Sequence, residues 1–210
     1  RVAEWMGRHG VDAQTQVVVY DQQQANYCAR LWWLLKWCGH EAVAVLDGGL
    51  AAWQKEGLPV ESGPAVAPSP CHFELRPSCV NWLSTQEVAE TLGKGPVIID
   101  ARARPRYLGE TEPLDPVAGH IPGARNRPFN LNLQENGLFK SPEVLRQEFQ
   151  ALLDGQSPET VIHQCGSGIS AIPNLLAMEV AGLGRSRLYP GSWSEWCNTP
   201  GLPCAKGEGT

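Results

Sequence analysis

Short apolar runs alternate with amphipathic stretches along the chain, which is typical of strands alternating with helices. Apolar, largely β-branched runs predict strands at residues 17–20, 43–46, 96–100, 161–164 and 187–189. Helices are predicted from about residue 25 to 38 and from about residue 170 to 181, and a glycine follows each of them. Strands that alternate with helices form a parallel sheet covered on both faces. We therefore expect an α/β fold.

Two further helices are predicted from the residues that begin them. Ser84-Thr85-Gln86-Glu87 has the spacing of a capping box. Ser141-Pro142-Glu143 places a cap and a first-turn proline at the start of the other helix. Both lie in the second half of the chain, where they add helices to the predicted α/β pattern.

The pattern also occurs twice, with glycines, tryptophans and prolines in one register. The pairs separated by 143 or 144 positions are Gly39 and Gly182, Gly48 and Gly191, Trp53 and Trp196, Asp21 and Cys165, and Leu58-Pro59 and Leu202-Pro203. A shared offset of this kind is the signature of an internal repeat. The chain is therefore predicted to hold two copies of one domain.

The register also predicts where the copies begin and end. We expect the rear half of a domain at 1–60, a Pro-rich linker at 61–80, a complete domain at 81–204 and a tail at 205–210. Residues 81–143 have no counterpart in the first copy, and the sequence opens on Arg1 rather than Met. We expect the missing front half to belong to the molecule, either cleaved and retained or lying outside this sequence.

Composition narrows the function classes. Lys and Arg number 17 against 22 Asp and Glu, a net charge of −5, which argues against a nucleic-acid binder. No apolar run approaches the length of about 18 residues that a membrane span needs. Seven cysteines, an odd number without a CxxC pair or a His/Cys cluster, predict neither a disulfide framework nor a metal site. A reducing, cytoplasmic setting is the expectation.

Cys165 is the candidate chemical centre. It follows a predicted strand, and Gly166-Ser167-Gly168-Ile169 leads from it into a predicted helix. Ligands of open α/β sheets bind at the carboxyl ends of strands. A glycine-containing loop followed by a helix N-terminus can direct several N–H groups at one anion. The arrangement favours a nucleophilic thiolate; the alternative is a buried, inert cysteine.

The chain resembles the tandem rhodanese-like sulfurtransferases. Cys165-Gly166-Ser167-Gly168-Ile169-Ser170-Ala171 is similar to the active-site loop of the 3-mercaptopyruvate sulfurtransferase branch, with Ile and Ser where Val and Thr are usual. The other similar motifs are Asp100-Ala101-Arg102, Gly119-His120-Ile121-Pro122-Gly123-Ala124, Leu46-Asp47-Gly48-Gly49 and Tyr189-Pro190-Gly191-Ser192-Trp193-Ser194-Glu195-Trp196. The resemblance implies rhodanese-like domains in tandem, each with a central parallel sheet flanked by helices.

The resemblance also implies a ping-pong reaction. The Cys165 thiolate takes a sulfane sulfur from a small anionic donor, 3-mercaptopyruvate or thiosulfate, and passes it to cyanide or to a thiol, which a thioredoxin-like protein could carry. The sulfur is held as a persulfide, so no dissociable cofactor is expected. The substrate-binding candidates are Arg106, Gly166, Ser167, Gly168, Ile169 and Ser170. Asp21, at the position of the cysteine in the first copy, implies that this copy is inactive.

Residue differences leave the donor open. The mercaptopyruvate branch usually has a second arginine in the loop after Arg106, and residues 110–118 contain none, which keeps thiosulfate in consideration. A cysteine phosphatase is disfavoured because the next arginine after Cys165 is Arg185. A non-enzymatic rhodanese-like binding module is the remaining alternative, and it would be expected to lack the cysteine.

Other candidates receive structural interpretations. His120 is expected to be a hydrogen-bonded turn histidine, and Arg102 to brace Asp100. His163 shares a strand face with Cys165 and is expected to pack in the sheet rather than to tune the thiolate. The tryptophans are divided between the core (Trp32, Trp33, Trp53) and candidates for the pocket wall (Trp193, Trp196).

Overall fold

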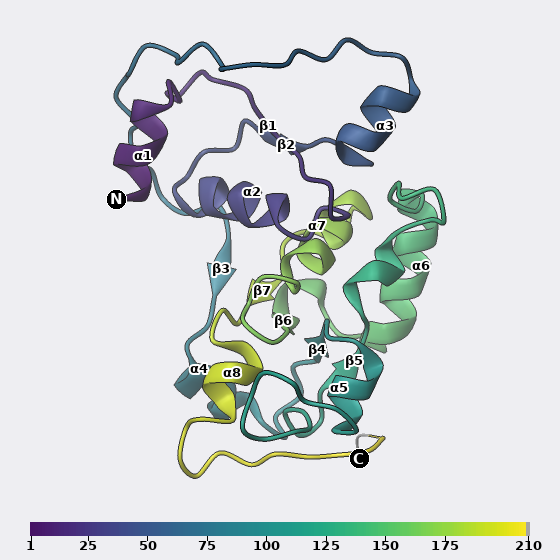
Figure 1. Ribbon diagram of the computed structural model, residues 1–210. Coiled ribbons are helices and arrows are strands. Elements are labelled where there is room, and N and C mark those ends of the chain that lie inside the picture. The colour runs from purple at the N-terminus through teal and green to yellow at the C-terminus, as the bar shows by residue number, and fades with distance from the viewer. Residues whose placement is uncertain (209–210) are drawn as a thin grey trace. The chain divides into compact units, whose positions relative to one another are not determined.

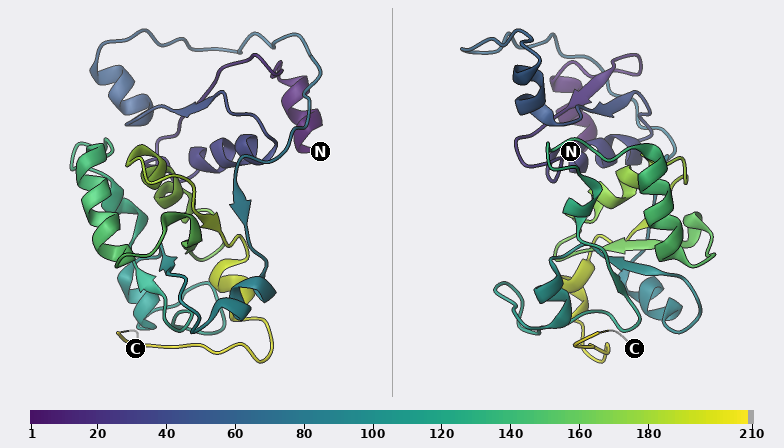
Figure 2. Two further views of the ribbon diagram at one scale, coloured as in Figure 1. Left: turned by 180° about the vertical axis from the view of Figure 1, so that it is seen from behind. Right: turned by 90° about the vertical axis from the view of Figure 1, so that its right-hand side faces the viewer.

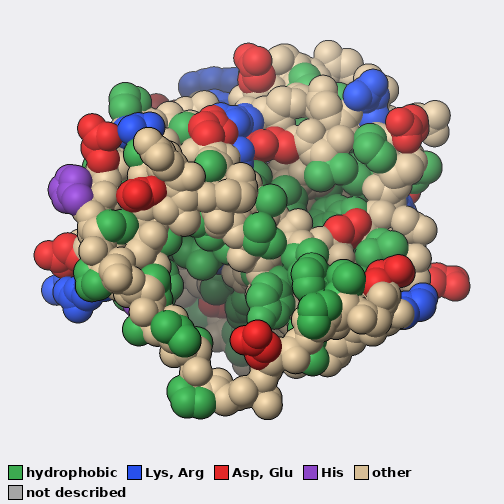
Figure 3. Space-filling view, turned by 90° about the horizontal axis from the view of Figure 1, so that it is seen from above, with side chains coloured by type: hydrophobic (Ala, Val, Ile, Leu, Met, Phe, Trp, Pro, Cys, Tyr) green, Lys and Arg blue, Asp and Glu red, His purple; other side chains and the backbone are tan. Residues whose placement is uncertain are grey.

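The computed structural model describes residues 1–208, which form two compact units. Unit 1 contains residues 1–80 with 136–138, and unit 2 contains residues 81–135 and the described residues from 139 onward. Within residues 1–208, every helix falls short of the length and apolarity needed to cross a bilayer. Acidic and basic side chains are interspersed over the face presented in Figure 3.

Unit 1 is built on two parallel strands in which Val17 pairs with Val43. Helix α2 packs against both strands and buries Trp32, Trp33 and Leu35. The elements of unit 1 are α1 (Val2–Arg8), β1 (Val17–Val19), α2 (Cys28–Trp37), β2 (Val43–Val45) and α3 (Gly49–Lys55).

The segment expected to be a linker is extended, and its second half is attached to unit 1. The N–H groups of Cys71 and Arg76 donate to backbone carbonyls of Gly7 (2.9 Å) and Cys38 (3.1 Å). Phe73 is buried beside His40, with ring centroids 5.8 Å apart. These contacts order residues 71–79 as a strap across unit 1.

Unit 2 contains a five-stranded sheet in the order β3-β7-β6-β4-β5, with every pair parallel. The sheet and the helices around it can be followed in Figure 1 and Figure 2. The elements are β3 (Asn81–Trp82), α4 (Thr85–Thr91), β4 (Ile98–Asp100), α5 (Arg104–Leu108), β5 (Arg125–Asn126), η1 (Phe129–Asn132), α6 (Pro142–Leu153), η2 (Pro158–Thr160), β6 (Ile162–Gln164), α7 (Ile172–Val180), β7 (Arg187–Leu188) and α8 (Ser192–Trp196).

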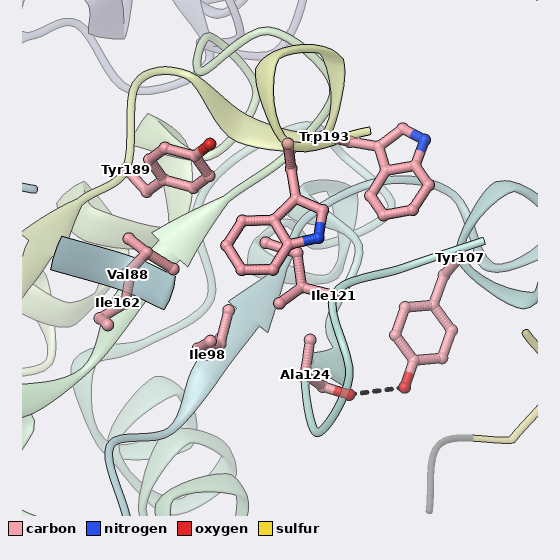
Figure 4. Packing of buried hydrophobic residues seen from close by; sticks show 9 residues of the cluster. Val88, Ile98, Tyr107, Ile121, Ala124, Ile162, Tyr189 and Trp193 are labelled. Carbon is pink, nitrogen blue, oxygen red and sulfur yellow. Dashed lines mark hydrogen bonds between the residues drawn. The ribbon is translucent and has the colours of Figure 1, made fainter. Parts of the chain in front are cut away.

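Side chains alternate between two cores on either face of this sheet. Ile98 and Ile162 pack with α4 and α8, in a cluster that includes Trp193 (Figure 4). Ile99 belongs to the other cluster, which contains residues of α6 and α7 such as Phe149. Helices therefore cover both faces, and the predicted α/β class with a central parallel sheet is confirmed.

The predicted helix caps are confirmed, whereas α7 and the strands are shorter than predicted. Ser84 and Glu87 form the capping box, and Ser141 accepts the N–H of Val144. Helix α7 begins at Ile172 rather than near 170, because the residues after Cys165 form a loop. The strands are shorter than the apolar runs that predicted them, because burial of an apolar run extends beyond its sheet hydrogen bonds.

The internal repeat is confirmed by a shared tertiary hydrogen bond. The indole Nε1 of Trp53 donates to the carbonyl of Pro59 at 2.9 Å, and that of Trp196 donates to Pro203 at 2.8 Å. Strands β1 and β2 of unit 1 are parallel neighbours, as are β6 and β7 of unit 2. The tandem arrangement expected from the sequence is therefore present.

The assignment of Trp193 and Trp196 to the pocket wall is wrong. Both side chains are fully buried in the core of unit 2, and their indole N–H groups donate to the carbonyls of Val117 and Pro203. Helix α8 lies against the sheet, so its large aromatic residues fill the core. The expectation for Trp32 and Trp33 is correct, and Trp53 is half-buried.

Candidate active site

Cys165 lies at the carboxyl end of β6, the strand between β7 and β4. Its N–H donates to the hydroxyl of Ser192 at 3.1 Å, and its carbonyl accepts the N–H of Trp193 at 3.0 Å. The next carbonyl, of Gly166, accepts the N–H of Ser194 at 2.9 Å. Three hydrogen bonds to α8 thus hold the start of the loop, and Cys165 is 2% exposed.

The loop after Cys165 presents a row of unpaired N–H groups. Within residues 1–208, none of the backbone N–H groups from Gly166 to Ala171 donates a hydrogen bond. Unpaired N–H groups ahead of a helix form a cradle for an anion. Ser167 is exposed and Ser170 is half-buried, so hydroxyl donors accompany the amides in this loop.

Gly168 sets the shape of the cradle. Its φ is +74°, and a Cβ there would lie 2.3 Å from the carbonyl oxygen of Pro190. Such a distance is impossible for a real side chain, so only glycine allows the loop to approach the turn before α8. Pro173 lies in the first turn of α7, where its missing N–H costs no hydrogen bond.

Arg106 of α5 borders this loop. Its Nη1 lies 3.4 Å from the point that a Cβ on Gly166 would occupy. The structure therefore brings this arginine and the Cys165 loop together, as expected from the sequence. Its side chain is 19% exposed, so the guanidinium remains open to solvent on one side.

Two carboxylates that sequence reasoning missed contact Arg106. Glu112 accepts hydrogen bonds from its Nη2 (2.6 Å) and Nε (3.2 Å), and Asp115 lies 3.5 Å from the same Nη2. Burial by itself raises the pKa of Glu112, but the hydrogen bonds from Arg106 and from the N–H of Leu114 outweigh it and hold the pKa below its usual value. Glu112 is therefore ionised at neutral pH. The sequence feature that could have indicated Glu112 and Asp115 is the acidic composition of the loop after Arg106.

The framework residues behave as predicted. Arg102 donates to both carboxylate oxygens of Asp100, with Nη2–Oδ2 at 2.6 Å, and to the carbonyl of Gly119 at 2.7 Å. The Nδ1 of His120 pairs with the carbonyl of Tyr107 at 2.8 Å, and the two rings stack with centroids 3.9 Å apart. The first set connects the end of β4 to Gly119, and the second connects α5 to the neighbouring His120.

His163 is buried on the α6–α7 side of the sheet. Its Nε2 lies 3.1 Å from the sulfur of Met178, and burial lowers the pKa of the imidazole to about 3. The ring is neutral throughout the physiological range. The structural interpretation of His163 as a packing residue therefore fits its surroundings.

In unit 1 the equivalent cradle is filled by the protein itself. The carboxylate of Asp21 accepts N–H groups of Gln23 (2.8 Å), Ala25 (3.0 Å), Tyr27 (2.9 Å) and Cys28 (2.9 Å). Burial raises the pKa of Asp21, but these bonds outweigh it and lower the pKa below its usual value. A carboxylate cannot carry sulfane sulfur, and it also occupies the N–H groups that would hold an anion.

This filled cradle makes a prediction about stability. Asp21→Asn removes the charge and directs an amide NH2 at two backbone N–H groups. The free energy of unfolding should therefore fall by about 1–3 kcal/mol at pH 7. The folded pKa lies below the unfolded one, so the contribution of Asp21 is present above about pH 4 and disappears as the pH falls through the folded pKa. Urea unfolding at pH 7 and in acid measures both effects. Glu61→Gln, an exposed charge in the same unit, is the control and should change little.

Comparison with known proteins identifies the family. The family model "Rhodanese-like domain" matches residues 2–56 and 84–199. The chain belongs to the rhodanese-like family. It is 44% identical over 201 residues to the "Probable 3-mercaptopyruvate sulfurtransferase" of Pseudomonas aeruginosa, covering 95% of this chain and 70% of the relative. It is 39% identical over 202 residues to the thiosulfate sulfurtransferase of Cricetulus griseus, covering 92% and 67%.

A solved structure agrees. The 3-mercaptopyruvate sulfurtransferase from Leishmania major matches this rhodanese-like chain with a TM-score of 0.80 at 30% identity, over 95% of this chain and 56% of that one. The chain thus spans about two thirds of the length of these curated relatives and about half that of the solved structure. These relatives include both 3-mercaptopyruvate and thiosulfate sulfurtransferases. Membership of the family therefore does not identify the donor of this protein.

Proposed function

We propose that the protein is a sulfurtransferase that moves a sulfane sulfur from a small anionic donor to a nucleophilic acceptor through a persulfide on Cys165. The observation that carries this proposal is the pairing of a cysteine at a strand end with a loop of unpaired N–H groups. The arginine beside Gly166 supplies a positive charge at the mouth of the same loop.

In the first half-reaction the Cys165 thiolate attacks the transferable sulfur of the donor and forms an S–S bond. With thiosulfate the donor S–S bond breaks, and its electron pair leaves with sulfite. With 3-mercaptopyruvate the C–S bond breaks, and the carbon takes a proton to give pyruvate. The backbone N–H groups of residues 166–171 and the hydroxyls of Ser167 and Ser170 stabilise the persulfide anion, as donors aimed at developing charge do elsewhere.

In the second half-reaction the acceptor attacks the outer sulfur of the persulfide. The persulfide S–S bond breaks, and its electron pair returns to Cys165 as the thiolate. Cyanide is converted to thiocyanate, whereas a thiol acceptor, such as that of a thioredoxin-like protein, becomes a persulfide. The transferred atom is bound covalently at every stage, so the proposal requires no dissociable cofactor.

The proposed setting is cytoplasmic. All seven cysteines have free thiols in the structure, and Cys71 and Cys204 are exposed. An exposed thiol persists most readily in a reducing compartment. The same condition keeps the thiol of Cys165 available for the donor.

Steady-state assays with each donor test the proposal. Thiosulfate or 3-mercaptopyruvate is supplied with cyanide, and the rate of thiocyanate formation is measured over a range of donor concentrations at each of several cyanide concentrations. The proposal expects turnover with at least one donor and parallel double-reciprocal plots, the sign of a ping-pong sequence. Absence of thiocyanate with both donors would overturn it.

Arg106 is predicted to act mainly in donor binding. Arg106→Ala should raise the KM for the donor by roughly tenfold to hundredfold, because the loss of one charge-assisted hydrogen bond weakens binding by about this factor. It should change kcat much less. Arg104→Ala is the matched control, because Arg104 lies on the same helix with half of its side chain exposed. An equal loss of kcat and kcat/KM in Arg106→Ala would contradict the binding role.

A further inference from the structure

The charges around Arg106 do not add up to a positive site. The network of ion pairs consists of two basic and three acidic side chains: Arg102, Arg106, Asp100, Glu112 and Asp115. Its formal sum is −1. A site that must attract an anionic donor thus contains one more carboxylate than its cations neutralise.

The two carboxylates on Arg106 differ in their surroundings. Glu112 is bonded by Arg102 (3.4 Å) as well as by Arg106, and it accepts the N–H of Leu114 at 3.1 Å. Its charge is therefore shared among several donors, and it orients the guanidinium. Asp115 contacts Nη2 of Arg106 at 3.5 Å, longer than the 2.6 Å from Glu112 to the same atom. The looser Asp115 contact adds negative charge without being needed to orient Arg106.

We propose that Asp115 is a specificity-determining residue, an internal counter-ion that competes with the donor for Arg106 and favours donors with one negative charge over dianions. The inference rests on the proposed sulfur transfer. Nη1 and Nη2 of the guanidinium lie 3.4 and 3.6 Å from the point that a Cβ on Gly166 would occupy, and Nη2 also contacts Asp115, so a donor anion at the Cys165 loop experiences both charges.

The size of the effect follows from the charge of the donor. Coulomb energy is proportional to the product of the charges, so the unfavourable energy between Asp115 and a dianion is twice that for a monoanion. The factor by which the affinity for a dianion falls is therefore the square of the factor for a monoanion. Where solvent screens most of the interaction, a carboxylate several ångströms from the donor reduces the affinity for a monoanion by about threefold and for a dianion by about tenfold.

The test compares Asp115→Asn with the unmodified protein using two donors that transfer sulfur from a sulfonyl-type centre. Thiosulfate is the dianion and methanethiosulfonate the monoanion. We expect Asp115→Asn to lower the KM for thiosulfate about tenfold and that for methanethiosulfonate about threefold, with kcat nearly unchanged. Asp115→Glu keeps the charge and should remain close to the unmodified protein.

Glu110→Gln is the matched control. Glu110 lies in the same loop, is exposed, and has no ion-pair partner among residues 1–208, so removing its charge should change neither KM by more than about twofold. Equal KM changes for both donors, or no change in Asp115→Asn, would overturn the inference while transfer by the unmodified protein left the proposed function standing. Absence of transfer by the unmodified protein with every donor would overturn both.

Discussion

Cys165→Ser is expected to reduce thiocyanate formation by at least about a thousandfold with either donor. A serine hydroxyl is nearly isosteric with the thiol, but at neutral pH it is neither an adequate nucleophile toward sulfur nor a stable carrier of a transferred sulfur atom. The substitution leaves the hydrogen bonds of residue 165 to α8 in place, because they involve the backbone. The loss should therefore appear in kcat, with the unfolding midpoint little changed.

The matched control is Cys71→Ser, which removes an exposed thiol from unit 1. Its turnover should equal that of the unmodified protein. Substantial turnover in Cys165→Ser, or an equal loss in Cys71→Ser, would place the chemistry on another thiol.

Gly168→Ala is expected to be the most damaging loop substitution that adds a single methyl group. The new Cβ would lie 2.3 Å from the carbonyl oxygen of Pro190, and the residue would also keep a φ of +74°. The loop must move away from the turn before α8, which displaces the N–H groups that hold the persulfide. We expect kcat to fall roughly hundredfold, the cost of about 1 Å of misplacement, and stability to fall by about 2 kcal/mol or more.

Gly184→Ala separates the two causes. Gly184 has a φ of +79°, but a Cβ there would have nothing within 4 Å. It should cost about 1 kcal/mol of stability from backbone strain alone, with turnover unchanged. If Gly168→Ala behaved no worse than Gly184→Ala, the close approach of the loop to Pro190 would not be needed for catalysis.

Local signals correctly predicted that Cys165 lies at the carboxyl end of a strand and is followed by a glycine-containing loop. The strand, Cys165 and the glycine loop are contiguous in the sequence, so their order alone indicated a thiol at a sheet edge. The repeat register was equally readable, because Trp53 and Trp196 keep one offset and make the same hydrogen bond to a proline carbonyl. Features that need only a short stretch of chain were thus within reach of the sequence.

Features that depend on how a loop folds back could not be predicted from the sequence. Glu112 and Asp115 follow Arg106 by six and nine positions, and their spacing does not reveal that both carboxylates return to one guanidinium. Trp193 was a candidate for the pocket wall, but α8 docks on the sheet and buries the indole completely, a contact that the local sequence does not reveal. The filled cradle around Asp21 likewise required the loop conformation, although the missing thiol was visible from the sequence.

The central claim is that sulfur passes through Cys165. Intact-mass measurement after incubation with donor alone tests it directly, followed by peptide mapping and a second measurement after addition of cyanide. The account predicts an increase of one sulfur atom per chain, located on the peptide containing Cys165, that disappears with stoichiometric formation of thiocyanate. Thiocyanate formation without any adduct on Cys165, or an adduct on another cysteine that discharges at the catalytic rate, would contradict it.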